Sequence, residues 1–235
     1  MKRFSNTNMI IPYVQKYKLD KIFKENIIEQ MELFSFDNGE LICSKDDELK
    51  YMYFLIEGKV KIYTLHEDGK SILLRFSNPL SIFGDIELLT NYKVLCNVES
   101  INKSTLIGID MKKLRKYACD DTSFLKFVIE NLSNKLYSIS NSTSINLLYS
   151  LESRLASYLL SMSDSENKVS NYLEVNIPKL TEIAPLLGTS YRHLNRTINE
   201  FINKDIIQKN KAIIIIKDVE TLKYLSQGNI YERLF

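Results

Sequence analysis

The stretch TEIAPLLGTSYRHLNRTINEF, residues 181–201, decides how the chain is organised. Its first half is mostly apolar, and Gly188, Thr189 and Ser190 then form a short polar break. Its second half carries arginine, histidine and asparagine within two or three helical turns. This pattern predicts two short helices joined by a tight glycine turn, the second helix having one apolar and one polar face.

The second helix is predicted to bury one side and expose the other. Leu194, Ile198 and Phe201 recur at i, i+4 and i+7 and are expected to face the core. Ser190, at the turn, can cap the helix and also reach a phosphate. Arginine forks suit the guanine edge in the major groove, and asparagine amides suit adenine. The outward residues are Tyr191, Arg192, Asn195, Arg196 and Asn199, and His193 lies in the same helix.

A basic hairpin is predicted to follow these helices. Residues 206–217, IIQKNKAIIIIK, read as two strands with Lys209–Lys211 as their turn, which places Lys209 and Lys211 near phosphates. Helix, turn, helix and basic-tipped hairpin are the layout of a winged helix-turn-helix. The polar helix alone is more often a solvated surface, but the full order of elements favours DNA binding.

Two local features refine this part of the chain. Pro185 lies inside the first of the two helices, so that helix must start late, near Thr181, or kink. A terminal helix follows the hairpin, with Asp218 as its expected N-cap.

Between Asp37 and Asp110 the chain reads as short strands separated by turns. Glu67–Lys70 is a hairpin signal, and many short strands at this spacing favour a sandwich or barrel over a parallel sheet. The apolar runs are residues 41–44, 51–58, 59–69, 70–77, 81–84, 94–100 and 104–110.

From Met111 the apolar period becomes helical. A helix from Thr122 to about Ser140 carries Phe124, Phe127, Val128, Leu132, Leu136 and Ile139 on one face. That face either packs on the chain's own barrel or forms a dimer seam, and the sequence favours neither. The polar run 141–144 is interpreted as a break and a hinge. Residues 147–162 then read as an amphipathic helix, 164–171 as a polar loop and 173–177 as a short strand.

Composition limits the class of protein. The 235 residues are 45% hydrophobic and 26% charged, with a net charge of only +2, so an anion-binding surface must be local. The three cysteines are widely spaced and form no metal-binding motif, and no signal-peptide or membrane-spanning run occurs. A soluble cytoplasmic protein is expected. No catalytic constellation or phosphate-binding loop occurs, so an enzyme is not expected.

The chain resembles the Crp/Fnr family of bacterial transcription regulators over nearly its whole length. IEGKVKIYTLHEDGKSILLRFSNPLSIFGDIELL and LLGTSYRHLNRTINEF carry the likeness, which is strongest to the YeiL-type members. The resemblance implies an α+β fold: an N-terminal double-stranded β-helix, jelly-roll-like, as sensor domain; a long dimerisation helix; and a C-terminal winged helix-turn-helix. We expect an effector domain at residues 1–143, including the dimerisation helix at about 122–141, and a DNA-binding domain at 144–235.

The resemblance also implies partners and roles. A homodimer would place its two helices in successive major grooves of inverted-repeat DNA, and RNA polymerase is an expected partner, whereas a membrane is not. Family base-reading positions fall on Tyr191, Arg192, Asn195 and Arg196, and the phosphate-contacting serine is Ser190. Arg192 departs from the acid of many relatives, whereas Arg196 matches the arginine of most.

The sensor pocket departs from the cyclic-nucleotide pattern. Residues 83–89 keep the family's frame, and Asp85 retains a carboxylate that either meets a ribose hydroxyl or caps a turn. Residues 94–96, Val-Leu-Cys, stand where relatives place the arginine that clamps the phosphate. A buried phosphate without a charged partner costs several kcal/mol, and Lys93 would point to the wrong face. Cyclic AMP is therefore not expected, and no cofactor is identified. The expected pocket residues are Phe83, Gly84, Asp85, Val94, Leu95 and Cys96.

The sequence offers no other sensor. The cysteine cluster of oxygen-sensing relatives is absent, and His66 reads as a surface residue. A thiol switch at Cys96 or Cys119 competes with the commoner inert cysteine. We expect a homodimeric regulator controlled by a signal other than cyclic AMP. Two alternatives stay open: an effector-independent orphan regulator, and a ligand-binding or protein-interaction module that no longer reads DNA.

Overall fold

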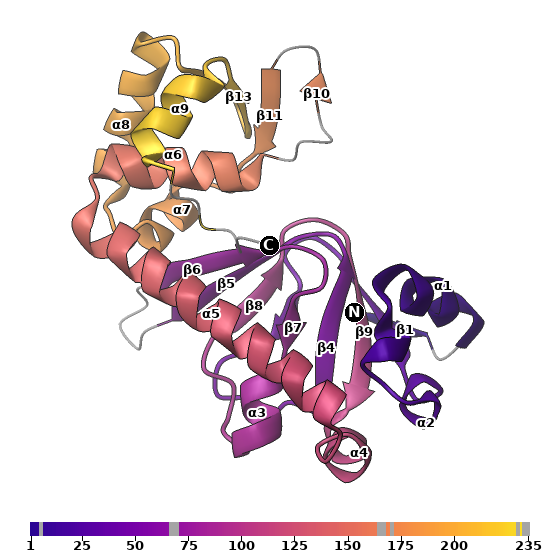
Figure 1. Ribbon diagram of the computed structural model, residues 1–235. Coiled ribbons are helices and arrows are strands. Elements are labelled where there is room, and N and C mark those ends of the chain that lie inside the picture. The colour runs from indigo at the N-terminus through magenta and orange to yellow at the C-terminus, as the bar shows by residue number, and fades with distance from the viewer. Residues whose placement is uncertain (5–6, 66–70, 164–167, 170–171, 229–230, 232–235) are drawn as a thin grey trace. The chain divides into compact units, whose positions relative to one another are not determined.

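The computed structural model describes residues 1–4, 7–65, 71–163, 168–169, 172–228 and 231. Chain contacts divide it into two units, residues 1–64 with 76–137 and residues 65–75 with 138–234. Figure 1 labels the elements, and the strands up to residue 110 form a β-roll. Their bounds are β1 (Lys2–Phe4), β2 (Glu32–Phe36), β3 (Leu41–Cys43), β4 (Tyr51–Glu57), β5 (Val60–Leu65), β6 (Ser71–Ser77), β7 (Ile82–Phe83), β8 (Asn97–Ser100) and β9 (Ser104–Asp110).

The β-roll consists of two sheets, with strand orders β1-β2-β9-β4-β7 and β3-β8-β5-β6. The pairs β2–β9, β4–β9, β3–β8 and β5–β8 are antiparallel. Each of the seven predicted apolar runs contains one of these strands, which confirms the jelly-roll-like sensor fold. The predicted turn at Glu67–Lys70, and His66 beside it, lie outside the described residues.

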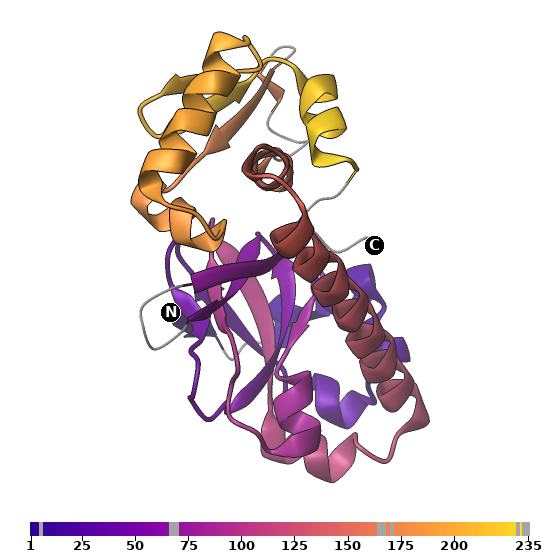
Figure 2. The ribbon, with the colours of Figure 1, turned by 90° about the vertical axis from the view of Figure 1, so that its left-hand side faces the viewer.

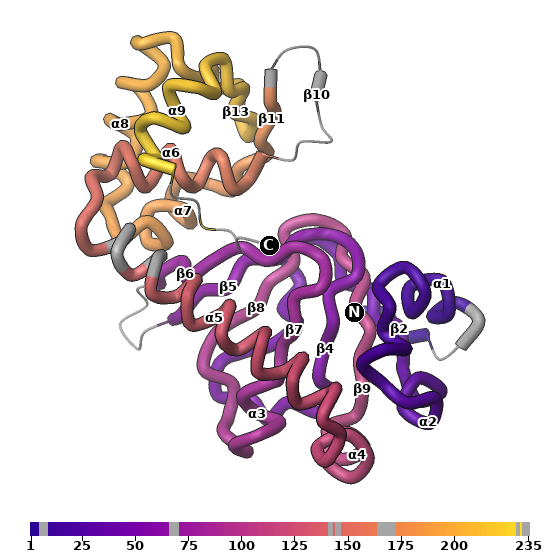
Figure 3. The backbone as a smooth tube through the Cα atoms, viewed as in Figure 1, coloured from indigo at the N-terminus to yellow at the C-terminus, as the bar shows by residue number. Residues whose placement is uncertain are grey.

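The N-terminal segment adds elements for which the sequence reading made no prediction. They are β1, α1 (Thr7–Tyr17), a 3-10 helix (Leu19–Lys21), α2 (Glu25–Ile28) and β2. β1 pairs antiparallel with β2, and Arg3 forms an ion pair with Glu32 across these strands. Figure 3 shows α1 and α2 at the side of the roll near β2 and β9.

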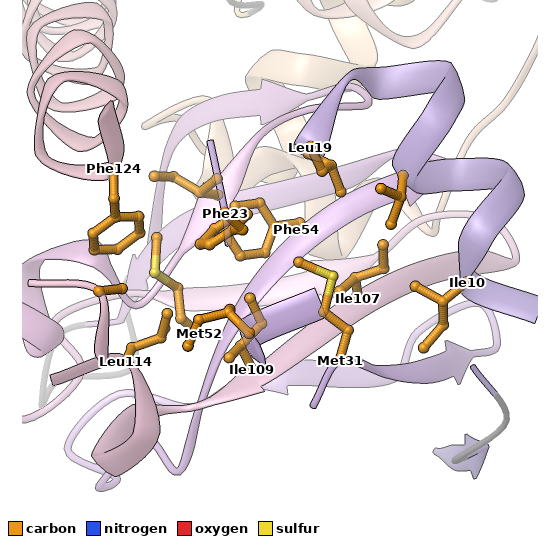
Figure 4. Packing of buried hydrophobic residues seen from close by; sticks show 14 of the residues in the cluster. Ile10, Leu19, Phe23, Met31, Met52, Phe54, Ile107, Ile109, Leu114 and Phe124 are labelled. Atoms are coloured by element: carbon orange, nitrogen blue, oxygen red, sulfur yellow. The ribbon is translucent and has the colours of Figure 1, made fainter. Parts of the chain in front are cut away.

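The core of the β-roll joins the N-terminal segment, the strands and α5 (Thr122–Leu148). The ring of Phe23 lies 5.4 Å from that of Phe54 and 5.4 Å from that of Phe124, between centroids. Phe127 stacks on Phe54 at 6.0 Å. Figure 4 shows Phe23 and Phe54 together within this cluster, with Phe124 to one side of them at the start of α5. The first turns of α5 are therefore part of the roll's own core.

The predicted break at Asn141–Ser144 is wrong. α5 continues as one helix to Leu148 rather than ending at about residue 141. Serine, threonine and asparagine cost at most about 0.7 kcal/mol each in a helix interior, and a serine hydroxyl can bond the preceding turn. Ser133 does so on Ile129 of this helix, at 2.9 Å. The sequence pattern mistook such tolerated residues for a helix end.

The chain breaks instead at Tyr149–Ser150. The Ser150 side chain accepts a hydrogen bond from the Ser153 amide at 3.3 Å and caps α6 (Leu151–Met162). The predicted start of α6 at Leu147 is therefore wrong, because Leu147 and Leu148 belong to α5. α6 therefore begins directly after Ser150, whose hydroxyl accepts a hydrogen bond from a free backbone amide, and not where the apolar pattern resumes.

The second unit is a winged helix-turn-helix. It contains α7 (Leu180–Leu186), α8 (Tyr191–Asn203) and α9 (Val219–Ser226), with a sheet of order β10-β11-β13-β12. α6 packs against both α8 and α9, as Figure 2 shows with α6 seen end-on. The strands are β10 (Lys168–Val169), β11 (Tyr172–Asn176), β12 (Ile207–Asn210) and β13 (Ile213–Ile216).

Three local predictions concern this second unit: the cap of α9, the start of α7 and the polar loop 164–171. Asp218 caps α9 as expected, accepting from the Thr221 amide at 2.9 Å. α7 starts at Leu180, close to the expected Thr181, and keeps Pro185 inside the helix. The predicted polar loop 164–171 includes the strand β10, and its other residues lie outside the described ones.

The predicted hairpin turn is shifted. Asn210 pairs with Ile213, so Lys209 ends up inside β12 and the turn is Lys211–Ala212. Lys211 takes the left-handed conformation, φ 53°, that a two-residue hairpin turn requires. The predicted three-residue turn, Lys209–Lys211, is therefore replaced by a two-residue turn.

Candidate nucleic-acid interface and ligand pocket

α8 is a strongly amphipathic helix whose start is fixed by a side-chain cap. The Ser190 hydroxyl accepts a hydrogen bond from the His193 amide at 3.3 Å, as expected for an N-cap. Leu194, Ile198 and Phe201 are buried, which confirms the predicted core face. The apolar side therefore anchors the helix and leaves its polar side free for a partner.

The polar side of α8 is available to solvent. Tyr191, Arg192, His193, Arg196 and Asn199 are exposed, and Asn195 is half-buried. Within the described part of the chain, neither Arg192 nor Asn199 has a hydrogen-bond or ion-pair partner. These side chains can form the bidentate contacts that read base edges in a major groove.

Arg196 is held only loosely on that face. Its side chain is 69% exposed, and its Nε lies 3.7 Å from Glu200 Oε1, one helical turn away. Such exposed i,i+4 pairs contribute at most about 0.5 kcal/mol. A guanine edge can therefore displace Glu200 at little cost.

The wing and the start of α7 form a basic hollow beside α8. Its volume is about 410 Å³, and Tyr191, Lys209, Lys211, Lys179 and Thr181 are among its lining residues. Lys179 and Thr181 were missed by the sequence reading, which treated α7 as a packing helix. Lys179 directly precedes Leu180, where α7 begins, and that position was the available signal. The three lysines suit a phosphate backbone next to the groove.

The expected pocket residues of the β-roll begin at the end of β7. Phe83 is buried, and Gly84 takes φ +95° just before α3 (Asp85–Thr90). A Cβ at Gly84 would come within 2.6 Å of Met111 and 2.8 Å of Leu49, so only glycine fits there. Tight packing at Gly84 therefore fixes where the following carboxylate, Asp85, can lie.

Asp85 is 1% exposed and is already paired within the chain. Its Oδ1 accepts a hydrogen bond from Lys135 Nζ of α5, while its Oδ2 is buried without a partner among the described residues. The sequence reading assigned this carboxylate to a ribose hydroxyl or a turn cap and missed Lys135. The distance of fifty positions along the chain gave no signal for the pair.

The remaining pocket residues separate by exposure. Val94 is buried and Cys96 is half-buried, but Leu95 is 58% exposed and faces away from Val94. Lys93 is exposed as well, although residues 91–96 precede β8 and lie outside any strand. Of these residues Val94 is the buried one, so the buried position at this site is apolar.

Burial shapes the ionisation of nearby groups. It raises the pKa of the Cys43 thiol well above its usual range, and the negative charge of Glu87 adds to this. Burial also raises the pKa of Cys119, against the effect of Arg115. A raised pKa lowers the thiolate fraction that redox chemistry needs, which disfavours Cys43 and Cys119 as redox sensors.

Two negative findings concern the residues that the structure describes. None of their His, Cys, Asp and Glu side chains gather in a group of three or more able to hold a metal ion. Across the same ranges, no helix has the length and apolarity needed to span a bilayer.

Models of known protein families match segments in both units of the chain. A model of the cyclic nucleotide-binding domain matches residues 33–120, and a model of the Crp-like helix-turn-helix domain matches residues 153–225. The chain belongs to the Crp/Fnr family. It is accordingly a DNA-binding transcription regulator and not an enzyme, as the sequence predicted.

Individual relatives agree over most of their length. Regulatory protein YeiL of Escherichia coli O157:H7 is 27% identical over 87% of this chain and 90% of its own. A CRP-like cAMP-activated global transcriptional regulator of Mycobacterium tuberculosis is 22% identical over 83% of this chain and 88% of its own. The crystal structure of a CRP-family transcriptional regulator from Thermus thermophilus matches the fold with a TM-score of 0.71 at 20% identity, over 85% and 99% of the two chains.

Proposed function

We propose that this regulator binds inverted-repeat operators as a homodimer and responds to a signal other than cyclic AMP. The observation that carries the first part is the exposed polar face of α8, capped by Ser190 and flanked by the basic hollow. In this proposal Arg192, Arg196, Asn195 and Asn199 read bases, and Ser190, His193, Lys209 and Lys211 meet the backbone.

The second half of α5 supports a homodimer. Phe124 and Val128 are buried in the roll, whereas Ile129 and Leu136, seven residues apart and thus on one side, are exposed. Exposed apolar side chains that recur on one side of a helix favour a protein partner, and a second copy supplies a matching stripe. The exposed large apolar residues of α5 are Ile129, Leu136, Tyr137, Ile139, Leu147 and Leu148.

Operator spacing follows from this pairing. Two recognition helices need half-sites one helical turn apart, roughly 34 Å, to bind together. We infer that the Tyr149–Ser150 junction, rather than the 141–144 segment, sets this spacing, because α5 ends there and α6 begins. A signal changes the spacing only through its differential affinity for two arrangements. RNA polymerase as partner and the cytoplasm as location remain predictions of the same model.

The pocket supports a signal other than cyclic AMP. Asp85 is engaged by Lys135, and the buried position at residue 94 is a valine. A cyclic phosphate placed beside Val94 would lose its hydration without a charged partner. The same Asp85–Lys135 pair favours a second candidate, an effector-independent regulator, since the charge of the carboxylate is balanced without a ligand. Full operator affinity of ligand-free protein would favour that second candidate over a ligand-switched one.

The test is a selection of genomic DNA fragments by the purified protein, with Arg196→Ala and Lys209→Ala in parallel. We expect an inverted repeat to emerge. Arg196→Ala should lose about 1–3 kcal/mol at one base position, whereas Lys209→Ala should weaken all sequences alike and lower the salt slope. Binding that is insensitive to salt and sequence, or absent, would favour a protein-interaction module instead.

A further inference from the structure

The turn between α7 and α8 is closed by a regular set of backbone hydrogen bonds. The Gly188 amide donates to the Pro185 carbonyl at 2.9 Å, and the Thr189 amide donates to the Ala184 carbonyl at 2.9 Å. This pair of bonds is a Schellman motif with Gly188 in the left-handed conformation, φ +60°. It satisfies the carbonyls of Ala184 and Pro185 at the end of α7, and that of Leu187 is among those it leaves over.

Arg154 of α6 takes up this remaining carbonyl. Its Nη1 donates to the Leu187 oxygen at 2.6 Å, and the Leu187 residue itself is completely buried. A charge-assisted bond at the carbonyl end of a helix also meets the negative end of the helix dipole. The turn is thus stabilised both by its own backbone hydrogen bonds and by Arg154 of α6.

The turn is shaped to admit the guanidinium. A Cβ built on Gly188 would lie 3.2 Å from Arg154 Nη1, closer than most such contacts. Glycine therefore serves both the backbone conformation and the approach of the arginine. Arg154 and Gly188 act as one contact between α6 and the turn.

Arg154 also lies at the junction of α5 and α6. Its amide donates to the Ser150 carbonyl at 3.1 Å, in the first turn of α6, and Ser150 is the residue that caps α6 after α5 ends. Its Nε is buried without a partner among the described residues. The guanidinium therefore donates one charge-assisted hydrogen bond, from Nη1, and its Nε is left without an acceptor among the described residues. A small movement of α6 can exchange this hydrogen-bond arrangement for another.

We propose that Arg154 is a positioning residue that fixes α8 through the Leu187–Ser190 turn and transmits movement of the α5–α6 junction to it. The inference rests on the proposed function, because it concerns the DNA-reading helix. Arg154 touches no base or phosphate in this proposal. Its effect is on base discrimination, not on the electrostatic part of binding.

The test compares Arg154→Met and Arg154→Lys with wild type and with Lys223→Met. Lys223 lies in α9 of the same unit and, among the described residues, its ammonium pairs only with exposed Glu220, at 2.9 Å. Its loss therefore removes the same charge without touching the turn. Two quantities are measured: the ratio of operator to random-DNA affinity over a salt series, and amide hydrogen exchange of residues 184–190.

We expect Arg154→Met to lower the specificity ratio tenfold or more, with an unchanged salt slope and faster exchange of the Gly188 and Thr189 amides. Arg154→Lys, which keeps a charged donor, should recover part of both, and Lys223→Met should match wild type. An unchanged ratio with unchanged exchange in Arg154→Met would overturn the inference, as would a reduced salt slope, which would mean that Arg154 binds phosphate directly.

The two proposals fail separately. If wild type itself shows no preferred sequence, the proposed function fails, and turn exchange alone then decides whether Arg154 holds the turn. If wild type selects an operator and Arg154→Met selects it equally well, the regulator stands and the positioning role does not.

Discussion

The β-roll pocket and the outer face of α8 use similar side chains in opposite ways. In the pocket, the buried Asp85 carboxylate is paired with Lys135 of the same chain. On α8, Arg192 is exposed and, among the described residues, unpartnered, and Arg196 is 69% exposed beside Glu200. The pocket carboxylate is neutralised by a lysine of the same chain, whereas the arginines of α8 stay available to an anionic partner.

The contrast follows from the cost of burial. A buried charge needs a partner within the fold, whereas an exposed arginine keeps its hydration until a ligand replaces it. An exposed polar face can therefore stay without a partner until DNA binds, and the folded state is not destabilised by it. A ligand that meets Asp85 either competes with Lys135 for Oδ1 or bonds Oδ2, which has no partner among the described residues.

Breaking the pocket pair should give the largest effect. Lys135→Met leaves the Asp85 carboxylate buried without its ammonium partner, so the free energy of unfolding should fall by about 3–5 kcal/mol. Urea unfolding followed by circular dichroism measures the loss, since the chain has no tryptophan.

The second substitution decides whether the pair is the cause. Asp85→Asn added to Lys135→Met removes the stranded charge and should restore much of the lost stability. A loss under about 1 kcal/mol in Lys135→Met, or no recovery in the double variant, would show that the pocket does not depend on this ion pair.

α5 extends this comparison. It leaves apolar side chains exposed to solvent, in the way that α8 leaves polar ones exposed. Leu136 is 71% exposed, so Leu136→Glu should disrupt a dimer seam without unfolding the protomer. Operator affinity should fall by at least about 10²-fold, because two linked half-site contacts become independent. Sedimentation and operator titration on the same samples measure both effects.

A matched substitution outside the seam controls for the added charge. Leu41, at the start of β3, is also exposed, and Leu41→Glu should keep both the dimer and the affinity. If Leu136→Glu remains a full-affinity dimer, the stripe on α5 is not the dimer interface.

The sequence predicted those features whose cause is local. The strands of the β-roll follow from alternating apolar runs, and the buried side of α8 follows from the period of Leu194, Ile198 and Phe201. The Ser190 and Asp218 caps were predictable because a hydroxyl or carboxylate before an amphipathic run takes up free amides.

The features that the sequence could not predict depend on contacts between distant segments. Lys135 meets Asp85, and Arg154 meets Leu187, only after α5 and α6 have packed. The false hinge at 141–144 has a different cause. Residue preferences of a few tenths of a kcal/mol suggested a break, but they do not end a helix that is continued by apolar residues on both sides.

The smallest expected effect is a pH dependence at Glu87, beside the pocket pair. Burial raises the pKa of Glu87, and the negative charge of Asp85 adds to this while Lys135 opposes it. The folded state then holds this proton at pH values where the unfolded chain, with an ordinary carboxyl pKa of about 4.3, has lost it. The free energy of unfolding should therefore decline as pH rises through the range above about 4.3. Glu87→Gln should flatten this decline in urea titrations, whereas Glu29→Gln, at an exposed carboxyl, should keep it. An unchanged slope in Glu87→Gln would mean that the carboxyl reaches solvent, and that the pocket is more open than the Asp85–Lys135 pair implies.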